Sequence, residues 1–242
     1  MSRILIPLPD QDFDITEVVV PWRVFCDAGF DVVFATEEGA TAACDPLLVT
    51  GVIFGKLGAK PENVALYREL EKDAAFQKPI RYSEIDVDFA GVVLPGGHAK
   101  GMRQYLESEV LRTRLLALWK ADRPFGAICH GTIVLARLVD AEGAPVARGR
   151  RATCLPAWME LSAWALTAWK LGDYYRTYKQ TVEAELREAL GSDGVFERGP
   201  LSNNYARPFV VEDGNLVTAR WPGDAQRFSE LLLDLVSRKS TQ

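Results

Sequence analysis

Histidine is the scarcest chemically useful residue in this chain of 242 residues, because only His98 and His130 are present. Any acid–base or metal chemistry built on imidazole must use one of these two positions. Cysteine is also sparse, and no Cys-x-x-Cys spacing joins any of the four: Cys26, Cys44, Cys129 and Cys154. Metal sites and disulfide frameworks show closely spaced or paired cysteines. We therefore expect free thiols, with no metal site and no structural disulfide.

Long apolar runs, positive net charge and nucleotide-binding motifs are lacking as well. No stretch approaches the roughly 20 apolar residues that a membrane span requires, and the N-terminal apolar run is too short for a signal peptide. The net charge is −5 and the pI is about 5.2, whereas nucleic-acid binders usually carry a basic stripe. No G-x-G-x-x-G or P-loop motif occurs. These absences predict a cytoplasmic protein without membrane, nucleic-acid or cofactor partners.

The first 36 residues have the pattern of a strand, a helix and a second strand. Residues 3–8 and 31–36 are short apolar runs, and residues 15–28 carry apolar side chains at helical spacing after a capping Asp14. A helix that joins two strands is typical of parallel pairing. We predict an α/β fold, namely a flavodoxin-like three-layer αβα sandwich with a mostly parallel central sheet.

The remaining pattern fits a single domain over residues 1–242. Residues 37–60 have no clear period and are predicted to be loop, and residues 156–190 are predicted to form a helical insertion rich in Trp and Tyr. The other predicted elements are strands at 88–94, 124–128, 209–212 and 216–219, and helices at 61–72, 108–120, 130–139, 181–190 and 225–236.

Cys129 lies where a predicted strand runs directly into a predicted helix. The small residues Ala127 and Gly131 flank it at two positions on either side, which is the pattern of a nucleophile elbow. Such a tight reversal presents the side chain above the sheet at a helix N-terminus, where the helix dipole favours a thiolate. The alternative is a buried, inert cysteine, which is the usual state of a free thiol. The elbow pattern favours a nucleophile.

Two short motifs carry a resemblance to a known family. The segments Ala-Ile-Cys129-His130-Gly131 and Leu-Pro-Gly-Gly97-His98 resemble the ThiJ/PfpI superfamily of the class I glutamine amidotransferase-like fold, nearest its chaperone and glyoxalase III branch. The family's glutaminases complete their triad with a histidine near the C-terminus. This chain has no histidine after position 130, which argues against a glutaminase. The resemblance also implies a homodimer and a small-molecule substrate.

The resemblance assigns roles to residues at matching positions. Cys129 would be the nucleophile, and Glu17, from the first predicted helix, would lie beside its sulfur and relay protons. The backbone N–H groups of Gly97 and His130 would form an oxyanion hole for a tetrahedral adduct. The side chain of His130 would orient or deprotonate the thiol. A plain solvated carboxylate is the alternative for Glu17.

Two further positions complete the expected site. Glu160 is the candidate acidic partner of the His130 ring, and its alternative is an ordinary exposed helix residue. His98 would line the mouth of the pocket and touch substrate, or it would only close the turn. The segment around Trp158 and Trp164 would form a lid or a dimer surface, unless it is simply core.

Three functions remain open on the sequence. The first is a cofactor-free, cysteine-dependent enzyme of small reactive carbonyls, converting methylglyoxal to lactate as a glyoxalase III does. The second is a Cys–His hydrolase or peptidase of the PfpI type. The third is a stress chaperone or a cysteine redox sensor without turnover, because an exposed low-pKa cysteine oxidises readily.

Overall fold

A seven-stranded sheet forms the centre of the molecule. The computed structural model describes residues 2–53, 55–201 and 204–240. Neighbouring strands follow the order β3-β2-β1-β4-β5-β9-β8 and pair in parallel, except that β8 is antiparallel to β9. The strands are β1 (Arg3–Pro7), β2 (Asp31–Thr36), β3 (Ile80–Arg81), β4 (Phe89–Leu94), β5 (Phe125–Ile128), β8 (Val210–Asp213) and β9 (Leu216–Ala219).

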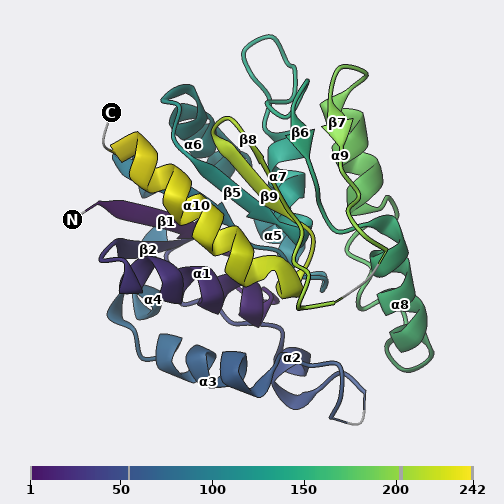
Figure 1. The fold of residues 1–242 in the computed structure, drawn as a ribbon. Helices are drawn as coiled ribbons and strands as arrows, with labels where there is room; N and C mark the ends of the chain where they lie inside the picture. The colour runs from purple at the N-terminus through teal and green to yellow at the C-terminus, as the bar shows by residue number, and fades with distance from the viewer. Residues whose placement is uncertain (1, 54, 202–203, 241–242) are drawn as a thin grey trace.

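Helices cover both faces of this sheet and complete three layers (Figure 1). One face carries α1 (Ile15–Asp27) and α10 (Ala225–Ser240), and α3 (Pro61–Leu70) packs beside α1. The other face carries α5 (Met102–Glu107), α6 (Glu109–Lys120) and α7 (Thr132–Arg137). This arrangement confirms the predicted flavodoxin-like αβα sandwich with a mostly parallel sheet.

Helix α1 shows how the local sequence determines an element near the site. Asp14 caps it, and its Oδ1 accepts hydrogen bonds from the backbone N–H of Thr16 at 2.8 Å and of Glu17 at 3.1 Å. The apolar stripe predicted from the sequence faces the core, and the helix ends before Gly29, whose φ is +82°. The cap therefore holds the first turn of α1, which carries Glu17, close to the carboxyl ends of the strands.

Several elements escaped the sequence patterns. Within the predicted loop 37–60, Asp45 caps a short helix, and the aromatic-rich segment contains a long helix followed by the predicted acidic one. The long helix is α8 (Ala157–Leu171), and the acidic helix predicted at 181–190 is α9 (Val182–Leu190). Elements that were not predicted are α2 (Pro46–Thr50), α4 (Ala74–Gln77), the two-stranded sheet of β6 (Arg151–Ala152) and β7 (Val195–Phe196), and the 3-10 turns η1 (Tyr82–Glu84), η2 (Cys129–Gly131) and η3 (Pro222–Asp224).

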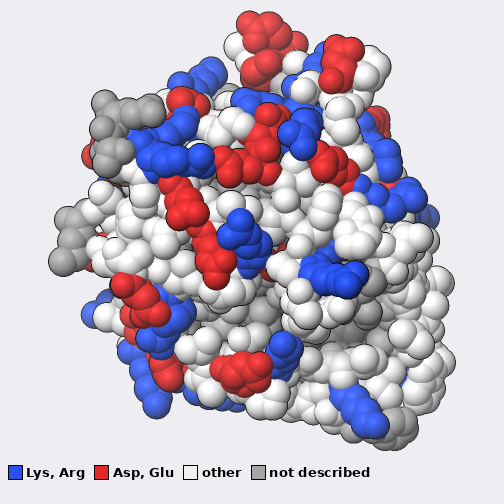
Figure 2. Space-filling view, in the orientation of Figure 1, with Lys and Arg blue, Asp and Glu red and all other residues white. Residues whose placement is uncertain are grey.

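Charged side chains of both signs share one face of the molecule. On the face drawn in Figure 2, Lys and Arg side chains intermingle with Asp and Glu rather than forming a basic stripe. Among the described residues, no helix combines the length and apolar character needed to cross a membrane.

Candidate active site

Cys129 occupies a strained turn at the carboxyl end of β5. Its φ is +55°, in the left-handed region that side chains other than glycine rarely adopt. The turn η2 follows directly and leads into α7. Gly131 permits this geometry, because a Cβ at that position would lie 2.0 Å from the carbonyl oxygen of Leu94 at the end of β4. The predicted nucleophile elbow is therefore present in the backbone.

Two imidazole nitrogens face the sulfur of Cys129. The Sγ atom lies 3.6 Å from Nδ1 of His130 and 3.9 Å from Nε2 of His98. The two rings meet edge to face, with centroids 4.8 Å apart. Cys129 and His130 are each only 1% exposed, whereas His98 is partly exposed. Both histidines of the chain thus surround the same buried sulfur.

Glu17 approaches the same sulfur from α1 and is fully buried. Its Oε2 accepts a hydrogen bond of 2.8 Å from the backbone N–H of Gly96, and its carboxyl group interacts with the Cys129 thiol. Burial, together with the negative charge of Asp14, raises the pKa of Glu17 well above its usual value. The neutral, protonated form of Glu17 is therefore favoured. Its other oxygen, Oε1, has no hydrogen-bond partner among the described residues.

Burial shifts the pKa values of the other groups of the site toward their neutral forms as well. Burial raises the pKa of the Cys129 thiol well above its usual value, and the backbone N–H of His130 only partly opposes this. Burial lowers the pKa of His98 to about 4 and that of His130 well below its ordinary range. The sequence predicted a thiolate favoured by the helix dipole. That prediction is corrected here, because desolvation outweighs the dipole in so buried a site.

A hydroxyl group fixes the proton on the His130 ring. Thr177 lies in the chain segment between α8 and α9 and is fully buried. Its Oγ1 donates a hydrogen bond of 2.6 Å to the carbonyl oxygen of His98. The same Oγ1 lies 3.2 Å from Nε2 of His130. Since the single hydroxyl proton is committed to His98, Oγ1 must accept from Nε2–H. His130 therefore presents an unprotonated Nδ1 to the Cys129 sulfur. Thr177 belongs to no recognisable motif, so it could not be predicted as a site residue.

Glu160 does not make the hydrogen bond expected of it. It is buried on α8, where one carboxylate oxygen pairs with Arg176 at 3.2 Å and the other accepts from the backbone N–H of Val182 at 2.9 Å. The two ring nitrogens of His130 face Thr177 and Cys129 instead. Glu160 therefore anchors the segment that carries Thr177 and acts on His130 only through that segment.

The two turns expected to form an oxyanion hole lie against each other. A Cβ on Gly96 would lie 2.6 Å from the backbone nitrogen of His130, so the turn after β4 touches the elbow directly. A Cβ on Gly97 would lie 2.5 Å from the carbonyl oxygen of Asp12. Both glycines are required by close backbone approach, which places the N–H groups of Gly97 and His130 on adjacent turns.

Comparison with known proteins identifies the family. A family model described as ThiJ/PfpI family-like matches residues 8–191. The chain belongs to the ThiJ/PfpI family. An uncharacterised protein of Schizosaccharomyces pombe is 31% identical and aligns over 97% of this chain and 84% of its own length. The glutathione-independent glyoxalase hsp3101 of the same yeast is 26% identical over 88% of this chain and 83% of its own.

Solved structures of the family share the fold. Glyoxalase III from Candida albicans superposes with a TM-score of 0.71 at 19% identity, covering 97% of both chains. At this identity the similarity concerns the architecture. The sheet order and the elbow of this ThiJ/PfpI chain are accordingly those of an established fold.

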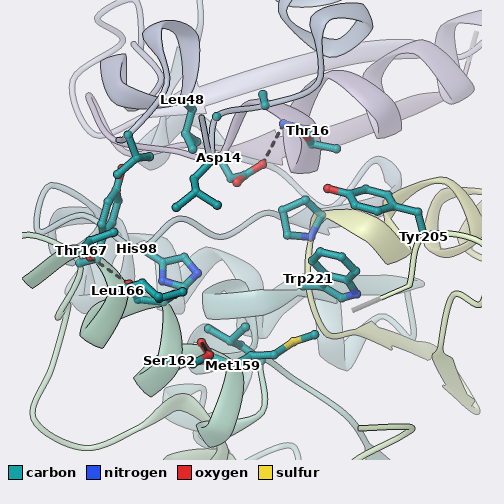
Figure 3. A pocket seen from close by; sticks show the side chains of 18 of the residues that line it. Asp14, Thr16, Leu48, His98, Met159, Ser162, Leu166, Thr167, Tyr205 and Trp221 are labelled. Carbon is teal, nitrogen blue, oxygen red and sulfur yellow. Dashed lines mark hydrogen bonds between the residues drawn. The ribbon is translucent and has the colours of Figure 1, made fainter. Parts of the chain in front are cut away.

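A cavity of about 340 Å³ lies close to Cys129 in this ThiJ/PfpI protein. His98 both lines this cavity and contacts the Cys129 sulfur, whereas Cys129 itself is not part of the cavity wall. Figure 3 shows His98 facing the cavity between Asp14 on one side and Met159 and Ser162 on the other. His98 therefore lies between the cavity and the Cys129 sulfur, and its contact with a substrate stays a prediction.

The sulfur of Cys129 and one ring nitrogen from each histidine are three donor atoms that can hold a soft divalent ion. The ligand atoms of His98, Cys129 and His130 all lie within 4.8 Å of one another. Tetrahedral zinc places S and N ligands about 3.4–3.6 Å apart, close to the two sulfur–nitrogen distances in this site. The fold thus brings His98 next to Cys129 and His130. The spacing of the cysteines in the sequence could not reveal this arrangement.

Proposed function

We propose that this chain converts small 2-oxoaldehydes, with methylglyoxal as the simplest example, into 2-hydroxy acids without a cofactor. The observation that carries the proposal is that two groups lie beside the Cys129 sulfur: Glu17, whose buried carboxyl has a raised pKa, and the unprotonated Nδ1 of His130. One group can give a proton while the other takes one. The name of the glyoxalase relative supports the same chemistry.

The first step joins the sulfur of Cys129 to the aldehyde carbon. The thiol proton moves to Nδ1 of His130, and the proton of Glu17 moves to the former aldehyde oxygen, which gives a hemithioacetal. The N–H groups of Gly97 and His130 would stabilise charge on that oxygen as it develops. The raised pKa of Glu17 favours the protonated carboxyl that this transfer requires.

The second step moves a proton between the two substrate carbons. The Glu17 carboxylate removes the hydrogen from the hydroxyl-bearing carbon, and His130 protonates the neighbouring carbonyl oxygen, which gives an enediol. Return of the proton from Glu17 to the second carbon, with loss of the hydroxyl proton to His130, gives a thioester. Water then hydrolyses this thioester to lactate and regenerates the Cys129 thiol.

The structure favours this reaction over peptide hydrolysis. Cysteine hydrolases rely on a histidine that is oriented by a further polar group and alternates between base and acid. The orienting group here is the neutral hydroxyl of Thr177, and burial lowers the pKa of His130 well below its ordinary range. A long-lived imidazolium form of His130 is therefore disfavoured. The carbonyl reaction needs this cation only briefly, between proton transfers that are coupled to those of Glu17.

The decisive experiment measures lactate formed from methylglyoxal by the wild-type protein, Cys129→Ala and Cys26→Ala. Cys26 lies on α1, outside the site, so its variant controls for loss of a thiol. We expect lactate from the wild type and from Cys26→Ala, and none above background from Cys129→Ala. Lactate formation that persists in a folded Cys129→Ala protein would overturn the proposal.

A further inference from the structure

The cavity beside His98 combines an acidic wall with aromatic walls. Its described lining residues include Asp14 but no Lys or Arg. Aromatic rings come from four positions: Trp158, Tyr175, Tyr205 and Trp221. The remaining surface is mostly aliphatic or thioether, with Leu48 and Met159 on facing sides in Figure 3. A cavity of this composition accommodates a ligand that is partly apolar and does not repel a positive charge.

One of the two carboxylate oxygens of Asp14 is available to a ligand. Its Oδ1 receives both capping hydrogen bonds of α1, and Oδ2 receives none from the described residues. The side chain is only 8% exposed, and its exposure is toward the cavity that it lines. Burial raises the pKa of Asp14 to about 6, so the group is mostly ionised above pH 7. A buried carboxylate without a cationic partner is costly, and a ligand cation would relieve that cost.

A second carboxylate adds to the negative potential. Asp45 is 2% exposed and accepts hydrogen bonds from the hydroxyls of Tyr174 at 3.2 Å and Tyr175 at 2.8 Å. Its charge is one of the causes that raise the pKa of Asp14, so the two carboxylates act on the same region. These neutral donors share hydrogen bonds with Asp45 but supply no positive charge.

The aromatic walls suit a positively charged nitrogen as well. Electron-rich ring faces attract cations through their quadrupole, and Trp and Tyr do so most strongly. Tyr205 already does this in the structure, because Nζ of Lys60 lies 3.8 Å from its ring centroid. Lys60 comes from the N-cap of α3 and is not among the residues that line the cavity. The cavity interior therefore retains ring faces and a carboxylate without a cation.

We propose that this cavity selects reactive carbonyl compounds that carry a positively charged nitrogen, which Asp14 and the surrounding aromatic rings bind. The inference rests on the proposed function, since it specifies the substrate class of the same site. The cationic group sits against Asp14 and the carbonyl group is directed toward His98 and Cys129. Neutral compounds such as methylglyoxal then react without this additional binding, and anionic compounds are disfavoured.

Direct binding tests the selection without requiring turnover. Choline and its neutral isostere 3,3-dimethylbutan-1-ol are titrated separately into the protein, with tryptophan fluorescence as the signal from Trp158 and Trp221. We expect choline to bind about tenfold more tightly than the isostere at pH 8. Equal affinity of the wild-type protein for the two compounds overturns the inference, whatever the lactate assay shows.

Two variants assign the selection to Asp14. Asp14→Asn keeps an N-cap acceptor for α1 and removes the charge, so it should abolish the preference for choline. Glu62 is an exposed residue of α3 whose charge also acts on the pKa of Tyr205. Glu62→Gln removes that charge and should retain the preference for choline. A preference that survives in Asp14→Asn, or disappears equally in both variants, contradicts the role of Asp14. Absence of lactate formation with intact choline selection would instead refute only the proposed reaction.

Discussion

Replacing Thr177 with valine would test the proton arrangement at the centre of the site. The substitution keeps the shape of the side chain and removes one hydroxyl group. That hydroxyl accepts from Nε2–H of His130 at 3.2 Å and donates to the carbonyl oxygen of His98 at 2.6 Å. Both partners are thus left unsatisfied in a site where Thr177 and His130 are almost completely buried.

The expected magnitude follows from these two lost hydrogen bonds. A buried donor or acceptor without a partner costs about 1–3 kcal/mol, so with two such groups the free energy of unfolding should fall by about 2–6 kcal/mol. His130 also loses the contact that keeps the proton on Nε2. Each 1.4 kcal/mol that favours the wrong tautomer reduces the population with a free Nδ1 about tenfold. We therefore expect kcat/KM for methylglyoxal to fall about 10–100-fold.

The assay separates the effect on the proton from the effect on stability. Lactate formation is measured as a function of pH for the wild type, Thr177→Val and Thr177→Ser, and urea unfolding is measured for the same three proteins. Thr177→Ser keeps the hydroxyl and should restore most of the activity. A folded Thr177→Val protein with wild-type kcat/KM, or a serine variant as inactive as the valine variant, would refute the assigned tautomer.

Three further predictions concern the elbow, the metal-binding atoms and the acidic wall. Gly131→Ala should lower the free energy of unfolding by about 3 kcal/mol or more in urea titrations, because its Cβ would lie 2.0 Å from the Leu94 carbonyl oxygen; unchanged stability would contradict this packing. Added Zn²⁺ should inhibit lactate formation reversibly, with EDTA restoring it, and inhibition as strong in His98→Ala would exclude that residue as a ligand. The folded state holds the Asp14 proton more tightly, with a pKa of about 6 against 3.8, so this group's stabilisation is full below pH 4 and is lost as pH rises through 6. Urea unfolding between pH 4 and 7 should show a smaller decline in Asp14→Asn, and an equal decline would contradict the assignment.

The features predicted correctly from the sequence are those that depend on neighbouring residues. The Asp14 cap, the helix that follows it and the elbow at Cys129 each arise within a few consecutive positions. The glycine of the elbow could be recognised because its spacing from Cys129 is fixed by the turn. Local patterns of this kind survive folding because the tertiary structure has little freedom to alter them.

The features missed are those that tertiary packing brings together. Thr177 follows α8 in the chain, yet its hydroxyl joins the two histidines from separate strand ends. Glu160 was expected to pair with His130, and only the folded structure reveals that its partners are Arg176 and the backbone N–H of Val182. The short helix capped by Asp45 has too few residues for a detectable period, and two distant tyrosine hydroxyls hold its cap.

The burial of Cys129 also bears on the choice between the proposed enzyme and a redox sensor. A thiol that reports peroxide must be exposed and ionised before the oxidant arrives. Cys129 is 1% exposed, and burial raises its pKa well above its usual value. In the proposed reaction a carbonyl substrate removes this obstacle, because its oxygen accepts the proton of Glu17 while the thiol proton passes to His130. The same burial therefore weighs against the redox-sensor alternative and not against the carbonyl enzyme.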